Sequence, residues 1–138
     1  MQTRTPVREK AFYIMVSLNE TCEHIVTLTQ SVFDELGPGL TECLYQKALC
    51  QSLRKNGHIV ESEVIINVIF DDVTVGFIRA DIIVDKSVCI ELKSKASLSL
   101  ADKVQASSYL NHKKELIVCI LMNFPPLKRD IESEVISR

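Results

Sequence analysis

Apolar residues follow two different spacings along the chain, and these spacings predict which parts form helices. From about Asn19 to Leu36 they recur every three or four positions, which is typical of one face of a helix. Gly37-Pro38-Gly39 ends that pattern, and a second helix is predicted from about Thr41 to Lys55, where Asn56-Gly57 stops it. Residues 1–10 show no such spacing and are predicted to form a loose tail.

The second half of the chain is predicted to form a sheet with one further helix. Three strands are expected, because Val and Ile are abundant and alternate over His58 to Phe70, Thr74 to Val84 and Val88 to Lys93. A helix from Ser97 to His112 follows. A continuous apolar run from Leu116 to Met122 is then typical of a strand buried on both faces. The last dozen residues are expected to add a short strand or helix.

The predicted order of elements is ααβββαβ, which indicates an α/β (α+β) fold with one mixed sheet flanked by helices. At 138 residues the chain fits a single domain, residues 1–138, that can bury a sizeable core. Its 46% hydrophobic and 25% charged residues are typical of a globular protein. The net charge of −2 lacks the basic surplus common in nucleic-acid-binding domains, although a local cluster could still bind nucleic acid.

The five cysteines predict reduced thiols rather than disulfides or a metal centre. Their number is odd, no two form a CxxC pair, and the three histidines stand alone. The pattern therefore indicates neither a disulfide framework nor a zinc or iron–sulfur site. We expect a reducing intracellular compartment, cytoplasmic or nuclear, because no secretory signal is visible and no apolar run reaches the length of a membrane span.

Three charged residues interrupt the apolar strands of the predicted hairpin, namely Asp81, Glu91 and Lys93. Glu91 and Lys93 are two positions apart, so they project from the same face of their strand. The side on which Asp81 lies depends on the turn. A two-residue turn at Asp85-Lys86 would place Asp81 opposite Ile90, so that Asp81 and Glu91 would face opposite ways.

A three-residue loop, Asp85 to Ser87, would instead pair Asp81 with Glu91. One face of the hairpin then collects only apolar residues: Ile82, Val84, Val88, Ile90 and Leu92. The other face collects Asp81, Ile83, Cys89, Glu91 and Lys93. Because a slip of one residue turns every side chain to the other face, this clean separation favours the three-residue loop.

Two carboxylates opposite each other on a sheet repel, which leaves a structural and a functional interpretation. In the structural interpretation, Lys93 or Arg79 offsets both charges. In the functional interpretation, a divalent cation sits between Asp81 and Glu91, since Mg²⁺ typically takes one or two protein carboxylates and keeps several waters. A metal-bound water is a usable nucleophile, and Lys93 could position it or stabilise negative charge. This set of residues suits phosphodiester hydrolysis.

The spacing of Asp81 and Glu91-Leu92-Lys93 resembles the signature of the PD-(D/E)xK nucleases, with Ala80 where that signature often has proline. The segment from Gly39 to Tyr45 adds a second resemblance, because it fits the motif G-x-x-E-x-x-Y. That motif names a family of PD-(D/E)xK-like proteins, the GxxExxY proteins.

Two further motifs lie closer to the C-terminus. Gln105 and Tyr109 fit the Q-x-x-x-Y motif that follows the E-x-K strand in RecB-type nucleases. Met122-Asn123-Phe124 closes an apolar strand as the L-x-N-F segment does in GxxExxY proteins. The resemblance extends from about Val26 to Phe124, and on these residues the chain is identified as a member of the GxxExxY family.

The resemblance implies a restriction-endonuclease-like core and a nuclease that uses Mg²⁺ or Mn²⁺. It implies that Asp81, Glu91 and Glu42 bind the metal ion and that Lys93 is the catalytic lysine. It also implies that Gln105 lines the site from the third helix. Without the resemblance, Glu42 would be an ordinary first-turn acid favoured by the helix dipole.

Tyr109, Lys95 and Lys103 are the candidate substrate-binding residues. Tyr109 lies four residues after Gln105 on the same helix face, where it could contact substrate, hold Gln105 or pack in the core. Lys95 and Lys103, together with Lys113 and Lys114, could form a rim that contacts phosphates, with the solvated surface as the alternative.

Three functions remain open from the sequence. The first is a metal-dependent nuclease acting on DNA, with RNA as a further candidate substrate. The second is an inactive nucleic-acid-binding or regulatory module that keeps the nuclease fold, and the third is a homo-oligomeric scaffold. The filled acid and lysine positions favour the nuclease. We see no recognition domain in the sequence, so we expect substrate selection to depend on this core, a second copy in a homodimer, or a protein partner.

Overall fold

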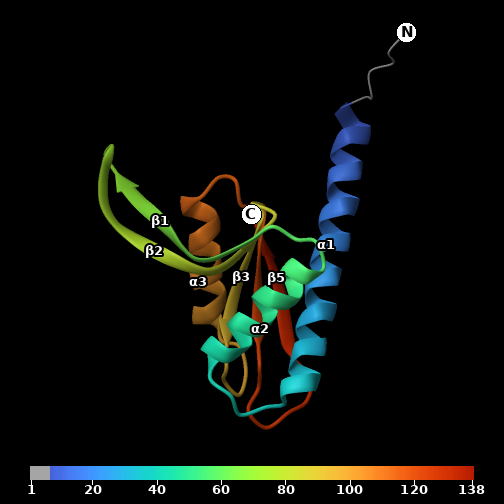
Figure 1. Ribbon diagram of the computed structural model, residues 1–138. Helices are drawn as coiled ribbons and strands as arrows, with labels where there is room; N and C mark the ends of the chain where they lie inside the picture. The colour runs from blue at the N-terminus through green and yellow to red at the C-terminus, as the bar shows by residue number, and fades with distance from the viewer. Residues whose placement is uncertain (1–6) are drawn as a thin grey trace.

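The computed structural model describes residues 7–138, apart from the side chains of residues 11, 12 and 14, and it shows a five-stranded sheet flanked by helices (Figure 1). The strands lie in the order β1-β2-β3-β4-β5; β3 and β4 are parallel and the other neighbours are antiparallel. The elements are α1 (Val7–Leu36), α2 (Glu42–Lys55), β1 (Val60–Phe70), β2 (Val73–Val84), β3 (Val88–Lys93), α3 (Leu100–His112), β4 (Val118–Asn123) and β5 (Glu132–Ser137).

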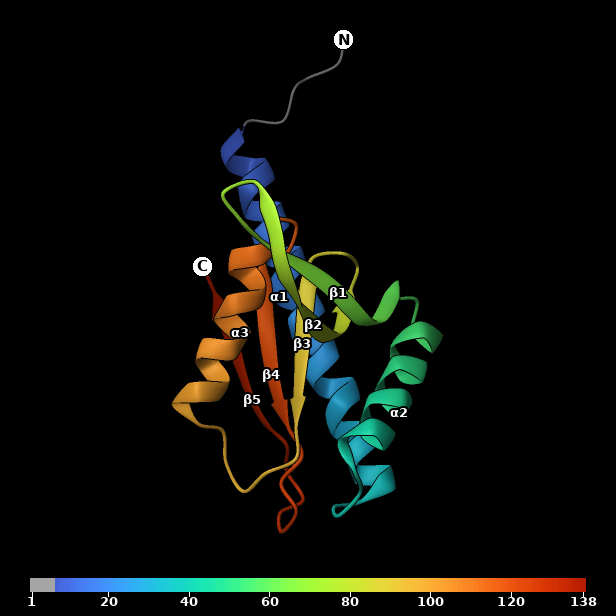
Figure 2. The same cartoon turned by 90° about the vertical axis from the view of Figure 1, so that its left-hand side faces the viewer.

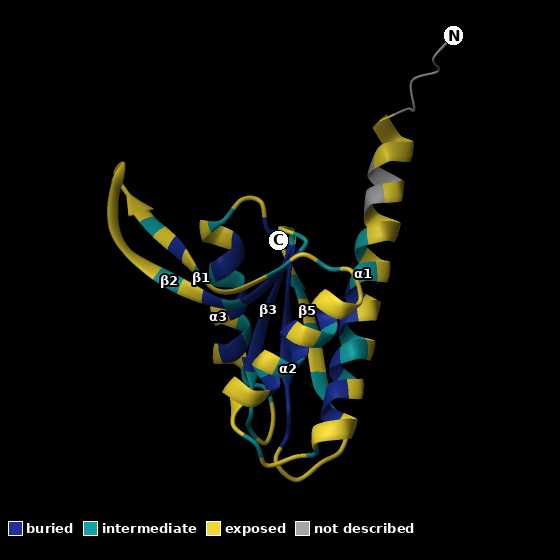
Figure 3. Ribbon diagram, viewed as in Figure 1, coloured by how far each residue is buried: buried dark blue, intermediate teal, exposed yellow. Residues whose placement is uncertain are grey.

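The sheet lies between two helical layers (Figure 2). Apolar side chains of α1 and α2 pack on one face of β3 and β4, and those of α3 pack on the other face. Because both faces are covered, β4 is buried along its whole length, which confirms the prediction for a continuous apolar strand (Figure 3). The predicted mixed α/β fold and the order ααβββαβ are also confirmed, with β5 as the additional C-terminal strand.

The register of the β2–β3 hairpin is the one predicted for the three-residue loop. Ile82 pairs with Ile90, Ile83 with Cys89 and Val84 with Val88. Ile82, Val84, Val88, Ile90 and Leu92 join the core under α1 and α2, whereas Ile83 and Cys89 join the core under α3. Glu91 lies two positions after Cys89 and projects toward α3 as well. The alternation of β2 changes at Asp81, because Ala80 joins the core under α3 although it lies two positions from Ile82.

Asp85 fixes this loop through its carboxylate. Its Oδ1 accepts a hydrogen bond from the Ile59 amide at 2.9 Å, and its Oδ2 lies 2.8 Å from His58 Nδ1. His58 in turn lies 2.9 Å from His24 of α1, measured between ring nitrogens. Asp85 and Lys86 have φ angles of 50° and 61°, a left-handed turn that aspartate tolerates better than most residues. The loop is therefore held from two sides.

The N-terminal helix is longer than predicted. The loose tail was expected over residues 1–10, but α1 begins at Val7, so this prediction is wrong for residues 7–10; residues 1–6 lie outside the described part. The reason is local, because Arg8, Glu9 and Lys10 favour helix and follow a proline that suits a helix start. The first turns of α1 extend past the sheet, where an exposed helix needs no apolar stripe (Figure 1).

Two further expectations can be compared with the fold. Cys22, Cys50, Cys89 and Cys119 are buried free thiols, as expected, while Cys43 is exposed. Among the described residues, no helix is both long and apolar enough to cross a membrane.

Candidate functional site

The charged residues of the hairpin meet where β2 enters the sheet beside the end of β3. Asp81 Oδ2 accepts a hydrogen bond from the Leu92 amide at 2.8 Å, so its side chain reaches across to β3. Lys93 Nζ lies 3.6 Å from Glu91 Oε1. The structure thus brings together all three residues that the hairpin pattern singled out.

Glu91 is an acid in an unfavourable position. Its side chain is only 6% exposed, and its Oε2 has no hydrogen-bond partner. Burial, together with repulsion from Asp81, raises the pKa of Glu91 to about 7, while Tyr109 and Lys93 act in the opposite direction. A buried carboxylate oxygen without a partner is costly in a folded protein, and this oxygen is free to accept a bound group.

The pKa of Asp81 is also raised, mainly because the carboxyl is partly buried and also because Glu63 lies nearby. The Leu92 amide and Lys93 oppose that shift. Two neighbouring acids with raised pKa values form a site whose charge the protein itself does not fully neutralise. A bound cation would remove this imbalance.

Lys93 is oriented by the third helix. Its Nζ donates a hydrogen bond to Gln105 Oε1 at 2.8 Å, and Gln105 Nε2 lies 3.4 Å from the Tyr109 hydroxyl. Tyr109 is 3% exposed and donates to the Arg79 carbonyl at 3.1 Å. Gln105 and Tyr109 thus form a chain of contacts from β2 to the lysine, and Tyr109 presents little surface to a substrate.

Glu42 approaches the site from the opposite helical layer without contacting it, and its side chain is exposed. It begins α2 and lies near the surface, yet Asp81 is close enough to raise its pKa, after the larger effect of partial burial. Lys93 and the Ser94 amide act in the other direction. Glu42 is thus near enough to Asp81 to be influenced by its charge, but no hydrogen bond or ion pair joins it to Asp81, Glu91 or Lys93.

The donor set fits a hard divalent cation. Carboxylate oxygens are the preferred ligands of Mg²⁺ and Mn²⁺. The Glu91 Oε2 atom, which has no hydrogen-bond partner, is available as such a ligand beside Asp81. Within residues 7–138, however, no three His, Cys, Asp or Glu side chains are close enough together to hold a metal ion as they stand. Mg²⁺ keeps several waters and often uses only one or two protein carboxylates, so Asp81 and Glu91 meet its requirement.

The two lysines predicted to contact substrate are engaged elsewhere. Lys95 Nζ lies 2.9 Å from Asp102 Oδ2 at the start of α3, and Lys103 Nζ lies 3.2 Å from Glu134 Oε2 on β5. The pair with Lys95 lowers the pKa of Asp102 to about 2. Neither lysine contacts the Asp81–Glu91–Lys93 cluster through an observed hydrogen bond or ion pair.

Two residues near the site were missed from the sequence. Gln46 Nε2 donates to the Asp81 carbonyl at 3.1 Å and to Glu63 Oε1 at 3.0 Å. Gln46 could have been found, because it lies four residues after Glu42 on the same helix face. Glu63 could not, since its place in an alternating strand looks like any solvent-facing acid; its φ of 54° is a feature of the structure alone.

Asn123, which the sequence places in the Met122-Asn123-Phe124 segment, supports the backbone after the lysine. Its fully buried side chain accepts from the Lys95 amide at 3.0 Å and donates to the Lys95 carbonyl at 2.8 Å. The next amide, of Phe124, donates to the Lys93 carbonyl at 2.9 Å. Asn123 and Phe124 therefore fix the backbone on which Lys93 is placed.

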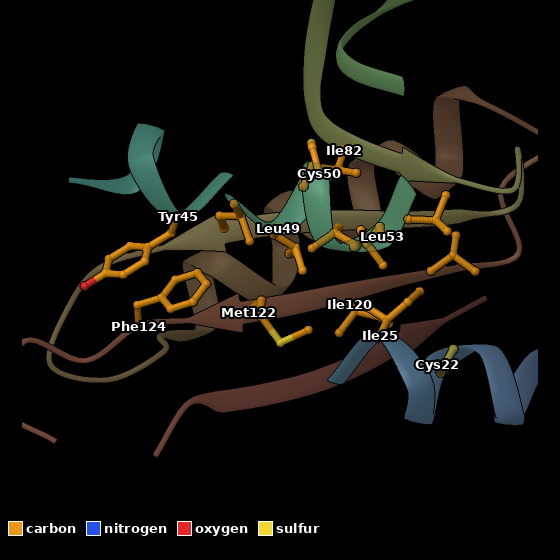
Figure 4. Close-up of a cluster of buried hydrophobic side chains, with 14 of the residues drawn as sticks. Cys22, Ile25, Tyr45, Leu49, Cys50, Leu53, Ile82, Ile120, Met122 and Phe124 are labelled. Atoms are coloured by element: carbon orange, nitrogen blue, oxygen red, sulfur yellow. The ribbon is translucent and has the colours of Figure 1, made fainter. Parts of the chain in front are cut away.

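Tyr45 explains the spacing of the G-x-x-E-x-x-Y segment in physical terms. The ring is fully buried and stacks on Phe124, with centroids 4.2 Å apart and planes inclined by 7° (Figure 4). Its hydroxyl donates to the Gly37 carbonyl at 2.7 Å and accepts from the Leu40 amide at 3.2 Å. Gly39, with a φ of 97°, gives this loop a turn that favours glycine. Tyr45 thus stabilises the Gly37–Leu40 loop that precedes Glu42.

Replacing Tyr45 with phenylalanine is expected to lower the free energy of unfolding by about 1 to 2 kcal/mol, because the Gly37–Leu40 loop loses both hydrogen bonds while the ring stacking remains. Urea unfolding of both proteins measures the change. Tyr45→Leu, which also removes the stacking, should cost clearly more. Equal stability of Tyr45→Phe and the wild type would show that the hydroxyl does not hold the loop.

Comparison with known proteins identifies a matching protein superfamily and two similar solved structures. A model of the PD-(D/E)XK nuclease superfamily matches residues 19–135. The crystal structure of SSO0001 is similar with 26% sequence identity and a TM-score of 0.52, over 70% of this chain and 50% of that one, so the chain aligns to half of SSO0001. The crystal structure of an alkaline exonuclease (LHK-Exo) from Laribacter hongkongensis is also matched, with 10% sequence identity and a TM-score of 0.39. That match covers 80% of this chain and 76% of the exonuclease chain. No curated protein matches the chain.

The superfamily model spans nearly all of the described chain, including α2, the β2–β3 hairpin and α3, which together carry the acids, the lysine and the glutamine. The mixed sheet between two helical layers agrees with that assignment. On this match, the chain belongs to the PD-(D/E)XK nuclease superfamily.

Proposed function

We propose that this protein is a metal-dependent nuclease that hydrolyses phosphodiester bonds of DNA, with RNA as the alternative substrate. The observation that carries the proposal is the buried Glu91, whose Oε2 lacks a partner while Asp81 and Lys93 lie beside it. Membership of a nuclease superfamily supports the same reaction class. Within that superfamily we assign the chain to the GxxExxY proteins, on Gly39, Glu42 and Tyr45.

In this proposal Asp81 and Glu91 bind Mg²⁺ or Mn²⁺, and Glu42 is the third acid. When bound, the metal ion lowers the pKa of a coordinated water and offsets negative charge that develops on the phosphate. The protein's own part is to keep two carboxylates together at a site where burial alone would favour their protonation. Glu42 would have to move closer than it now lies, since the three acids do not form a metal-sized cluster.

Lys93 provides positive charge at the reacting phosphate in this proposal. The Gln105 Oε1 atom accepts a hydrogen bond from the Lys93 ammonium group, which orients that group without neutralising its charge. Tyr109 is then a positioning residue, because it contacts Gln105 and the Arg79 carbonyl and is itself buried. A phosphate contact by Lys95 or Lys103 would compete with an existing ion pair, so we assign these lysines a secondary role.

The test is cleavage of labelled single-stranded, duplex and branched DNA, and of RNA, with and without Mn²⁺. We expect cleavage of at least one DNA substrate that requires the metal ion and disappears with chelation. An Asp81→Asn protein prepared in parallel controls for contaminating nucleases. No cleavage of any substrate by folded wild-type protein, or equal cleavage by Asp81→Asn, would contradict the proposal.

A second function is favoured by one observation. The three acids do not converge on a single point, which suits an inactive nucleic-acid-binding or regulatory module. Calorimetry with Mn²⁺ separates the two functions. Binding that requires Glu91 supports the nuclease, whereas no binding even in the presence of DNA supports the inactive module.

A further inference from the structure

The long hairpin formed by β1 and β2 has an apolar outer face that nothing in the structure covers. Its outer half projects beyond the helices, and Figure 3 shows this half as mostly exposed (Figures 1 and 3). Four large apolar residues on it, Ile65, Ile69, Val75 and Phe77, are exposed over 51% to 63% of their surface. Exposed apolar side chains are ordinary when scattered, but four on one hairpin form a patch.

The pattern along the strands places Ile65, Ile69 and Phe77 on one face, while Val75 is the unpaired residue of a bulge between the Val68–Gly76 and Ile69–Thr74 pairs. Ile66 is 3% exposed and packs with Ala106 and Tyr109 in the core under α3. Successive residues of a strand alternate between faces, so Ile65 lies on the side turned away from α3. Phe77, which pairs with Asn67, lies on that outer face as well. The hairpin is therefore amphipathic only at its root, where α3 covers the inner face.

The patch is large enough to matter for association. Ile65, Ile69 and Phe77, together with Val75 at the bulge, expose on the order of 500 Å² of surface, which is in the upper part of the range for the largest patch on a monomer. Phe70 and Val73, paired beside the tip, are 74% and 61% exposed. They lie on the same strand face as Ile66 and are not counted in the outer face. A standard stable interface buries roughly 800 Å² on each partner, so this hairpin supplies most of one.

The charges on the hairpin indicate which partner fits. Its tip carries Asp71 and Asp72, both exposed, which disfavours contact with nucleic acid phosphates. Its root carries Arg79 on the outer face, 62% exposed in its side chain and 2.9 Å from Glu63. A second copy packed with its hairpin antiparallel would bring the acidic tip of each copy to the arginine of the other.

We propose that the β1–β2 hairpin is a self-association surface, on which two copies of this chain pack their outer faces together about a two-fold axis. Such an interface is self-complementary, with Phe77 and Ile69 of both copies at its centre and an Asp71/Asp72 to Arg79 contact at each end. Pairing of the two β1 edges would not serve instead, because it would leave the outer faces exposed. The proposal does not depend on the nuclease assignment.

The first test is sedimentation velocity over a dilution series, with the chain as purified. The wild type is expected to form a dimer, and Phe77→Asp is expected to weaken the dimer at least about tenfold, since one central apolar residue becomes a buried charge. Leu127→Asp is the matched control, because Leu127 is 94% exposed in the β4–β5 connection and lies off the hairpin. Circular dichroism and thermal unfolding check that both variants keep the fold.

The second test reverses the charges at the two ends. Asp71→Lys/Asp72→Lys and Arg79→Glu should each weaken their own dimer, because like charges then meet at both ends. An equimolar mixture of the two variants should recover a heterodimer, in which every end again joins opposite charges. Recovery on mixing would distinguish antiparallel packing of two copies from a general loss of fold.

Three outcomes would overturn the proposal. One is a wild type that remains monomeric at every concentration. Another is a dimer that Phe77→Asp leaves unchanged, which would place the interface elsewhere. The third is a monomer whose binding to DNA is lost in Phe77→Asp but kept in Leu127→Asp, which would assign the patch to substrate binding.

Discussion

Replacing Lys93 with alanine is expected to lower the rate of phosphodiester cleavage by on the order of 10²- to 10³-fold, the usual effect of removing one group that stabilises charge in a transition state. The ammonium group is the cation nearest to Glu91, and Gln105 already orients it. The side chain is only 20% exposed, so its charge acts in a partly desolvated site. Single-turnover cleavage at saturating Mn²⁺ measures the effect on chemistry apart from substrate binding.

The control for Lys93→Ala is another lysine on the same domain. Lys55 is exposed in the last turn of α2, at the opposite end of that helix from Glu42, so Lys55→Ala should cleave normally. Manganese binding by Lys93→Ala should persist, because lysine is not a ligand. Full cleavage activity in Lys93→Ala would show that this lysine does not take part in the reaction.

Replacing Glu91 with glutamine is expected to abolish cleavage and yet to stabilise the metal-free protein at pH 8. The pKa of Glu91 in the folded protein is raised to about 7, mainly by burial, whereas a glutamate in the unfolded chain titrates near about 4.3. The folded state therefore binds the proton more tightly than the unfolded state does. It loses stability as the pH rises from the lower value through the higher one, by on the order of 3 kcal/mol.

Glutamine cannot ionise, so Glu91→Gln should avoid this loss. The difference in free energy of unfolding between variant and wild type should be small at pH 5 and should grow in favour of the variant up to pH 8. Urea unfolding at four or five pH values, in the presence of a chelator, measures it. Adding Mn²⁺ at pH 8 should stabilise the wild type more than the variant. An ion that binds only the folded state raises the free energy of unfolding, and Glu91→Gln removes one of the proposed ligands.

The matched control for this experiment is Glu61→Gln. Glu61 is an exposed acid on β1, so its removal tests the effect of one negative charge without the effect of burial. Its stability should run parallel to that of the wild type over the same pH range. A Glu91→Gln protein that unfolds more easily than the wild type at pH 8 would show that the ionised carboxylate is satisfied in the fold.

The hairpin and its charged face could be predicted because strands encode their faces in a strict period of two. Asp81, Glu91 and Lys93 stood out as polar positions in apolar strands, and only one register kept the apolar face intact. The packing of Tyr45 on Phe124 and the clamp by Asn123 could not be predicted in this way. Tyr45 and Phe124 are nearly 80 positions apart, and Asn123 is 28 positions from Lys95, so no local pattern encodes either contact.

Helix boundaries show a different limit. The predicted helices were located by their buried stripes, which is why the start of α1 was placed near Asn19 and not at Val7. The described side chains of residues 7–17 are exposed, so an interpretation based on buried stripes has no structural counterpart there. The ion pairs of Lys95 and Lys103 were likewise not predictable, because each acid partner lies on another element.

The proposed catalytic groups come from both sides of the sheet. Glu42 belongs to the helical layer on one face, whereas Glu91, Lys93 and Gln105 lie on the face that α3 covers. Neither hydrophobic core can assemble the site alone. A chain still leaving the ribosome, or one that has lost a single layer, therefore holds only some of the proposed catalytic groups. The proposed hydrolysis of nucleic acid thus requires the completely folded protein.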